Sequence, residues 1–464
     1  MWIEEKISRV YVSNKYNRRS QKGRIEVFDE ITPGEIKAGR KALLDGWGSR
    51  PNVILVKAQG AKVWDIEGKE YIDCTSQAWA NNIGACHPEV IEAVKEQIEK
   101  IFHAWYSWDT IPLLLLCKKL AEIAPGNLNK VNLCLNGSLA VESAMKLAMK
   151  NKLGRKYFVV MNSGYHGRSL ATLATSWVDP QIFSAFPHYM ENVLRVPEAY
   201  CYRCPLGLEY PQCNLRCTKC LENTITKGAN GGVIAVMVEP IQGNGGQLSF
   251  PLEWHKRVKE ICVRHEVLLI WDEVQTGFGR VGKMFAAELY GITPDILVFG
   301  KGVGGGFPLA GIIADEALRG YDTGENAFTF GHSPPSLVAV LANIKVLEEG
   351  ILLKRCTELN EYIINRLLEM QKKYEIIGDV RGPGLAIGIE LVKNRESKEP
   401  AIEEAAKIGQ MAFAKGVIFG MSKYAGTGHV LKIKPPLVIT DEEVEKVLKV
   451  FEKCISRVSN HLSS

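Results

Sequence analysis

The chain has 464 residues, of which 46% are apolar, so it is long enough to bury a large core in about two or three domains. Its formal net charge of +5 comes from acids and bases scattered along the chain, without the long basic block that grips a nucleic-acid backbone. No window approaches the roughly 18 to 20 apolar residues of a membrane span and the N-terminus is too polar for a signal peptide, so we expect a cytoplasmic globular protein that binds neither membrane nor nucleic acid.

The first expected elements are a helix and then a hairpin at "KVWDIEGKEYID" (62–73). The apolar run of "IPLLLLCKKLAEIA" (111–124) breaks at two lysines and is typical of a core helix. Further along, short apolar runs alternate with helical patterns such as 139–153 and 251–265. The expected strands of this region are 130–135, 157–162, 232–239, 266–273 and 295–301.

Continuous apolar strands that are separated by helices predict a mainly parallel sheet covered on both faces. We therefore expect an α/β large domain over residues 75–335. The chain ends, 1–74 and 336–464, remain outside it, and the second of these carries apolar runs at 385–392 and 429–440. We expect both ends to pack together into one smaller α+β domain.

Ligands of an open α/β sheet bind beyond the carboxyl ends of its strands, and polar residues follow the expected strands here. "NGS" (136–138) opens a helix, whose free N–H groups favour an anion such as phosphate. "SGYHGR" (163–168) places an aromatic ring and a histidine in a turn, and "EPIQGNGG" (239–246) adds an acid. These strand ends predict a binding site for a phosphorylated ligand.

Lys301 follows the last of these strands and precedes Gly302 and three further glycines, so little bulk surrounds its amine. A desolvated amine with a lowered pKa suits Schiff-base chemistry. Taken alone, a lysine on a glycine-rich loop is more simply explained as a surface residue, and only the chemistry of the other strand ends favours the reactive role.

Asp272 ends the apolar run "LLIW" (268–271), and carboxylates are rarely buried without a partner. A capped strand end is one explanation, and a metal site shared with Glu273 is another, although successive strand residues point to opposite faces. A third is the pyridine nitrogen of pyridoxal phosphate (PLP), whose proton a carboxylate can hold in place. Val274 would then lie on the face of Asp272, under the ring.

The chain resembles class III pyridoxal-phosphate aminotransferases, the group that includes ornithine, acetylornithine, 4-aminobutyrate and ω-amino acid transaminases. The resemblance covers about four fifths of the chain and implies an α/β protein of fold type I, a homodimer that binds PLP at its interface. The motifs that carry it, in chain order, are "SGYHGRSL", "VEPIQGNGG", "WDEVQTGFGR", "PDILVFGKGVGGGFPLAG" and "FTFGHSPPS".

The resemblance implies three catalytic residues. Lys301 would form the Schiff base with PLP, Asp272 would hold the ring nitrogen, and Tyr165 would stack on the ring. Val274 would pack on the opposite ring face, and Gln275 would reach the ring hydroxyl.

Further cofactor contacts are implied at the phosphate. Gly137 and Ser138 would bind it together with Thr329 of the partner subunit, and Glu239 would fix the surroundings of the cofactor. For His166, a packing or hydrogen-bonding role is as good an interpretation as proton transfer. One position departs from the family pattern, because Leu139 stands where an acidic residue is common.

The implied reaction is a ping-pong transamination from an amino acid or amine to an oxo acid, in which the Lys301 amine moves the substrate proton. Racemases, epimerases and decarboxylating enzymes of the same fold share these cofactor residues, so a PLP-dependent racemase or epimerase is the alternative. A structural or zinc-binding protein on an inactive scaffold is a second alternative, which the intact Lys301, Asp272 and Tyr165 disfavour.

The substrate is predicted from two departures. Glutamate-using members carry an arginine before "PPLVIT" and a glutamate in the "EPIQGEGG" loop, where this chain has Lys432 and Asn244. A lysine is a point charge rather than a planar fork, so we expect a pyruvate-type acceptor. Gln77 and Trp79 are expected to face the donor. The arginines beside cofactor motifs that could supply a second carboxylate site are Arg168 and Arg280.

Five of the twelve cysteines crowd into a segment at about residues 200–221, which interrupts the family pattern. Their spacing matches that of a zinc knuckle, while disulfides are rare in the cytosol. We expect a surface or interface insertion, and leave zinc, disulfides and free thiols open. The cysteines are Cys201, Cys204, Cys213, Cys217 and Cys220.

Overall fold

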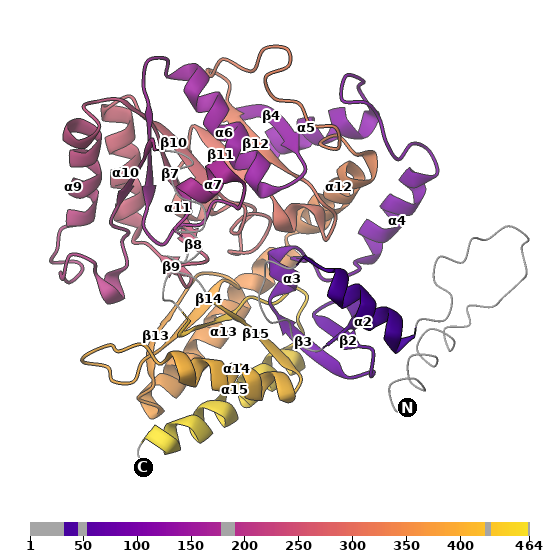
Figure 1. The fold of residues 1–464 in the computed structure, drawn as a ribbon, viewed down its shortest axis with the longest axis vertical. Helices are drawn as coiled ribbons and strands as arrows, with labels where there is room; N and C mark the ends of the chain where they lie inside the picture. The colour runs from indigo at the N-terminus through magenta and orange to yellow at the C-terminus, as the bar shows by residue number, and fades with distance from the viewer. Residues whose placement is uncertain (1–31, 45–52, 178–190, 423–427, 463–464) are drawn as a thin grey trace, which may run out of the picture.

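Two seven-stranded sheets organise the chain (Figure 1). The computed structural model describes residues 32–44, 53–177, 191–422 and 428–462. The central sheet has the strand order β4-β12-β11-β10-β7-β5-β6. Its strands are β4 (Leu128–Cys134), β5 (Tyr157–Met161), β6 (Val193–Val196), β7 (Val233–Val238), β10 (Leu268–Asp272), β11 (Ile296–Phe299) and β12 (Ala310–Asp315).

The central sheet confirms the predicted α/β class and its five predicted strands, β4, β5, β7, β10 and β11. Of its strands, only β12 runs against its neighbours, pairing antiparallel with β11 and β4. The sequence prediction missed β12 and β6. Arg195 interrupts the apolar run of β6 and Gly311 that of β12, so neither segment shows the continuous apolar pattern of the predicted strands.

Successive residues of the central strands enter opposite faces of the sheet, as the period of two requires. Met237 and Ile270 pack on one face with helix α6 (Gly137–Asn151), and Val238 and Trp271 pack on the other with α10 (Leu252–Arg264). Both faces are therefore covered, which is why these strands are apolar throughout.

The second sheet, here called the terminal sheet, joins strands from both chain ends in the order β1-β2-β3-β15-β16-β14-β13. The two ends meet where β3 pairs in parallel with β15, with Ile72 opposite Val417. The predicted hairpin at 62–73 is its β2–β3 pair. Its strands are β1 (Leu55–Gln59), β2 (Lys62–Asp65), β3 (Glu70–Cys74), β13 (Ile377–Arg381), β14 (Ile387–Leu391), β15 (Val417–Met421) and β16 (Val430–Ile433).

Further α-helices complete the described part of the fold. No helix in the described part of the chain has the length and apolar character that a membrane crossing requires. These helices are α2 (Pro33–Ala42), α3 (Ser76–Trp79), α4 (Pro88–Ile98), α5 (Ile111–Ile123), α7 (Leu170–Thr175), α9 (Arg216–Asn223), α11 (Ala286–Tyr290), α12 (Pro334–Glu348), α13 (Ile351–Lys373), α14 (Ile402–Ala414) and α15 (Asp441–Leu462).

Helix α5 corresponds to the predicted core helix at 111–124 but contributes only one face to the core. Leu116 and Leu120 are fully buried, whereas Ile111, Leu114 and Leu115 are more than half exposed. Four consecutive leucines wrap around more of a helix than one packing face can cover, so part of the run stays on the surface.

The cysteine-rich segment folds as a short 3₁₀ turn (Cys201–Arg203) followed by α9. All twelve cysteines of the chain are free thiols. No three His, Cys, Asp or Glu side chains of the described residues are grouped so that they could hold a metal ion. Burial raises the pKa of the Cys201 thiol to about 11.

Arg280 is a fully buried cation that ties loops around both sheets together. Its Nη1 donates to the backbone oxygens of Leu385 at 3.0 Å and Pro435 at 2.6 Å. Its Nη2 donates to Ser76 Oγ at 2.8 Å and Asn82 Oδ1 at 2.5 Å. Burial lowers the pKa of Arg280 to about 10. Both terminal nitrogens are committed to the fold, so Arg280 is not a site for a second substrate carboxylate.

Replacing Arg280 with methionine should lower the free energy of unfolding by about 3 kcal/mol, because several buried acceptors lose a charged donor. Chemical denaturation of the variant and the parent measures the difference. Arg319→Met is the matched control: Arg319 is 67% exposed, and its loss should change stability by less than about 0.5 kcal/mol. Equal stability of the two variants would contradict the structural role.

Candidate active site

A cavity of about 630 Å³ opens beyond the carboxyl ends of the central strands. Strands β4, β5, β10 and β11 all end at this edge because they run in the same direction. The loops that follow them therefore meet in one place. Residues predicted from the sequence that line the cavity are Gly137, Ser138, Leu139, Tyr165, His166, Arg168, Asp272, Val274, Gln275 and Lys301.

Asp272, the last residue of β10, is 4% exposed and carries two hydrogen bonds. Its Oδ2 lies 2.8 Å from Nδ1 of His166, and its Oδ1 accepts from the backbone N–H of Val274 at 3.1 Å. His166 is itself buried, so it orients the carboxylate from the protein side. Asp272 also lines the cavity, where it can face a cationic ring nitrogen.

Glu273 points away from the Asp272 site, as strand alternation predicts. Its carboxylate accepts from Thr276 Oγ1 at 2.9 Å and from the backbone N–H groups of Ala286 and Ala287 at 2.6 and 2.8 Å. Burial raises the pKa of Glu273 to about 7, against these hydrogen bonds. The two neighbouring acids thus serve different sites, and a metal shared between them does not fit.

Lys301 begins the 3₁₀ turn Lys301–Gly304 and has a left-handed φ of 48°. Its side chain is partly exposed to the cavity, and Nζ lies 6.0 Å from the ring centroid of Tyr165. Burial of the amine lowers the pKa of Lys301, while the charges of Asp272 and Glu239 oppose that shift. An amine held in this way is a better nucleophile at neutral pH than a surface lysine.

Glu239 lies behind the cavity and accepts hydrogen bonds from residues that form its walls. Its carboxylate accepts from the backbone N–H of Tyr165 at 2.7 Å, from that of Gly243 at 3.2 Å and from Gln275 Nε2 at 3.3 Å. Burial, aided by the charge of Asp272, raises the pKa of Glu239 to about 7. Glu239 therefore holds the Tyr165 turn and the Gln275 side chain in register.

Three features of the cavity fit a flat phosphorylated ring. The first turn of α6 lines it at Gly137 and Ser138, and first-turn N–H groups have no partner within their own helix. A Cβ on Gly137 would lie 3.1 Å from Val274, so glycine keeps this wall open. Gln275 Oε1 is buried without a hydrogen-bond partner and can meet a ring hydroxyl. The residues present fit PLP.

Besides Glu239, which lies behind the cavity, five predicted site residues are absent from its lining. Gln77 Nε2 donates to Asp73, and the ring of Trp79 lies under the cations of Arg280 and Lys434. The other three are Asn244, Lys432 and Thr329. Asn244 and Lys432 take part in contacts between the two sheets, described below, and Thr329 is exposed.

Lys434 is a buried residue near the site that sequence reasoning missed. Its Nζ donates to the backbone oxygen of Thr75 at 3.1 Å and lies 4.4 Å from the ring centroid of Trp79. Burial lowers the pKa of Lys434 well below its ordinary value, and the charge of Lys432 adds to the shift. The signal was present in "LKIK" (431–434), where residues two apart on a strand share a face.

Fold and cavity together place the protein among the PLP enzymes of fold type I. The chain belongs to the class III aminotransferases, because the family model described as "Aminotransferase class-III" matches residues 45–455. Members of this family depend on PLP, so PLP is the cofactor of this protein.

Individual relatives carry different activities. The leucine/methionine racemase of Thermococcus litoralis is 39% identical over 88% of this chain and 91% of that protein. The acetylornithine aminotransferase of Methanocaldococcus jannaschii is 34% identical over 90% of this chain and 97% of that protein. A solved Bacillus anthracis aminotransferase is 31% identical, with a TM-score of 0.85 over 91% of this chain and 98% of that one.

If Lys301 holds PLP covalently, borohydride should fix the cofactor to the peptide that contains Lys301. Lys301→Ala should keep PLP bound through phosphate and ring contacts but lower turnover by about 10³-fold or more, since the amine also moves the substrate proton. Peptide mass mapping and steady-state assays measure both effects. The control is Lys283→Ala at an exposed position, which should behave as the parent; label on any other lysine would refute the assignment.

Proposed function

We propose that this class III aminotransferase moves an amino group from an amino acid or amine to an oxo acid by a ping-pong mechanism. The observation that carries this proposal is the placement of the Lys301 amine and the Asp272 carboxylate in one cavity with Tyr165 and the first turn of α6. PLP supplies an electron sink when bound.

The residues of the chain would divide the work as follows. Gly137 and Ser138 bind the phosphate, and Gln275 orients the ring through its hydroxyl. Asp272, held by His166, keeps the proton on the pyridine nitrogen. The Lys301 amine binds PLP and, once released by the donor, carries the substrate proton between carbons as base and then as acid.

We also propose a homodimer in which Thr329 of the partner subunit completes the phosphate site. Thr329 is exposed beside Phe330, which is 56% exposed and lies 5.3 Å from the ring of His103. The segment that follows His103 exposes Trp105 and Trp108 as well. Exposed aromatic side chains gathered in this way favour a protein interface. Cytoplasm remains the proposed location.

The two sheets support a division into two domains, with the described residues of 1–74 and the chain end in the smaller one and the region from 75 in the larger. The boundary expected between residues 335 and 336 lies inside α12, which packs against α4 and α5 of the larger part. We therefore propose that the larger domain extends to the end of α12.

One experiment separates transamination from racemisation. The purified holoenzyme is incubated with a single L-amino acid, and amination of pyruvate is followed alongside loss of optical rotation. Formation of alanine together with an equal amount of the donor's oxo acid supports the aminotransferase. Loss of rotation without any oxo acid would instead establish a racemase, the activity named for the relative of Thermococcus litoralis.

For the acceptor, we predict a kcat/KM for pyruvate at least about tenfold higher than for 2-oxoglutarate with one common donor, equivalent to about 1.4 kcal/mol. Lys432 stands where the glutamate-using members have an arginine, and its single nitrogen, which donates to the Gly243 backbone oxygen, cannot clamp a second carboxylate as a planar fork would. Arg280 is committed elsewhere. Arg168 lines the cavity, so a preference for 2-oxoglutarate that Arg168→Met removes would contradict the prediction and identify the second carboxylate site.

A further inference from the structure

The loop of residues 243–246, here called the Asn244 loop, is held by three side chains that belong to the terminal sheet. Lys432 Nζ on β16 donates to the backbone oxygen of Gly243 at 2.8 Å. Ser422 Oγ, directly after β15, donates to that of Asn244 at 2.9 Å. Arg381 Nε, at the end of β13, donates to that of Gly246 at 3.0 Å. Three of the four loop carbonyls thus accept from the other sheet.

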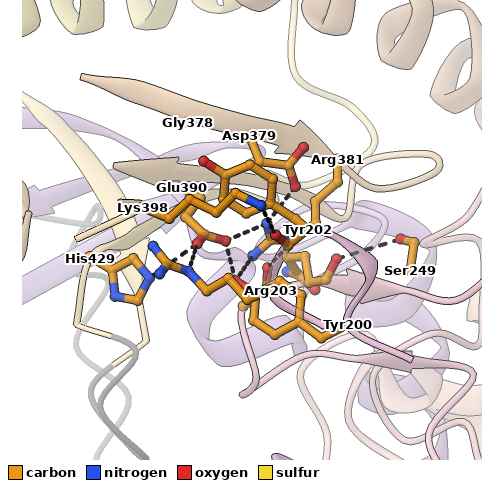
Figure 2. Close-up of polar contacts among 12 residues, drawn as sticks. Tyr200, Tyr202, Arg203, Ser249, Gly378, Asp379, Arg381, Glu390, Lys398 and His429 are labelled. Atoms are coloured by element: carbon orange, nitrogen blue, oxygen red, sulfur yellow. Dashed lines mark hydrogen bonds and ion pairs between the residues drawn. The ribbon is translucent and has the colours of Figure 1, made fainter. Parts of the chain in front are cut away.

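Arg381 is the member of this group whose orientation is fixed on every side (Figure 2). Its Nη1 donates to Asp379 Oδ2 and Glu390 Oε2, both at 2.6 Å, and its Nη2 donates to the Tyr200 hydroxyl at 3.3 Å. Each of its three nitrogens donates to partners in a different direction. A planar guanidinium can do this, whereas the single nitrogen of a lysine cannot.

Glu390 is fully buried and anchors this arrangement. Burial alone would raise the pKa of Glu390, but the hydrogen bond with His429 and the charge of Arg381 hold that pKa well below its usual range. Arg203 and Tyr200 of the cysteine-rich segment contact the same carboxylate. Arg203 therefore shares the anchor with Arg381, while its hydrogen bond goes to Glu390 and not to the Asn244 loop.

The Asn244 loop lies directly against the terminal sheet because glycines remove the side chains in between. A Cβ on Gly388 of β14 would lie 2.6 Å from the Gly246 oxygen. Gly246 has a φ of 106°, and a Cβ there would lie 3.1 Å from Arg381 Nη2. Any other residue at either position would push the loop away from Arg381.

Movement of the loop would reach the cavity. The N–H of Gly243 donates to Glu239 Oε2 at 3.2 Å, and a Cβ on Gly243 would overlap Gln275 Oε1. Gln275 lines the cavity, whereas Asn244 itself lies outside its lining, so the loop would act on the cavity through Glu239 and Gln275.

We propose that Arg381 is a positioning residue of the active site, which holds the Asn244 loop against the terminal sheet and thereby shapes the substrate side of the cavity. The proposal rests on the proposed function, because it assigns the loop to the substrate. In this role the Glu390 carboxylate does more than stabilise the fold, because it orients the Arg381 guanidinium, which reaches from the terminal sheet to Gly246.

The test compares Arg381→Lys with Arg203→Lys in the holoenzyme. Both keep the charge beside Glu390, but only Arg381→Lys loses the fork that reaches Gly246. We expect Arg381→Lys to speed amide hydrogen exchange in a peptide covering 243–249, and to raise KM for the amino donor about tenfold, which is about 1.4 kcal/mol, with kcat within about threefold. Arg203→Lys should leave both quantities at the parent values.

Equal exchange and equal KM in the two variants would overturn the proposal, because a purely structural role predicts the same effect from either arginine. If Arg381→Lys does not fold, Ser422→Ala removes another bond to the loop without touching a charge and should raise exchange in the same peptide; unchanged exchange would again overturn the clamp. A parent enzyme that neither transaminates nor racemises amino acids would refute the proposed function, while the exchange measurement still decides whether Arg381 holds the loop.

Discussion

The enclosed amine of Lys301, close to two buried carboxylates, is the constraint on which the site depends. Burial alone favours a neutral lysine, whereas the charges of Asp272 and Glu239 favour the ammonium. Neither carboxylate is left to the amine alone, because Asp272 is bonded to His166 and Glu239 to the backbone of Tyr165 and Gly243. The amine therefore lies among charges whose positions are set by the backbone, which keeps its reactivity independent of mobile surface groups.

These charged residues come together because the parallel strands that precede them end at the same edge of the sheet. β10 delivers Asp272, β11 leads to Lys301, and β5 leads to the turn of Tyr165. The register of β10 and β11 adds precision, because Asp272 stands opposite Val298, three residues before Lys301. A side chain at each strand end then reaches the same cavity, although Tyr165 lies more than a hundred positions before Asp272 and Lys301 in the sequence.

The terminal sheet is joined to the central sheet by cationic side chains as well as by apolar contacts. Arg280, Arg381 and Lys432 all donate to backbone oxygens across the junction of the two sheets. Such bonds are strong because the donor is charged and the surroundings are dry. They also demand close approach, which explains glycines such as Gly388 and Gly246 at the contact. Through Gly243, whose N–H donates to Glu239, the junction is connected to the residues behind the cavity.

The sequence by itself was sufficient for the α/β class, for five strands of the central sheet and for the cavity residues that follow them, since apolar runs and strand-end motifs are local signals. The strands β6 and β12 were missed because Arg195 and Gly311 interrupt their apolar runs. The same local signals predicted the candidate site residues Lys301 and Asp272, because their motifs lie on or beside single strands.

Tertiary structure alone decided which cations are available to a ligand. Arg280 and Arg381 are both arginines near glycine-rich stretches, and nothing in their neighbours along the chain shows that one ties Pro435 to Asn82 or that the other serves Glu390 and Gly246. Their partners come from distant segments, and hydrogen bonding between distant segments leaves no periodic pattern in a single sequence. Whether a buried charge binds substrate or binds the protein depends on those partners, and only the folded chain brings them together.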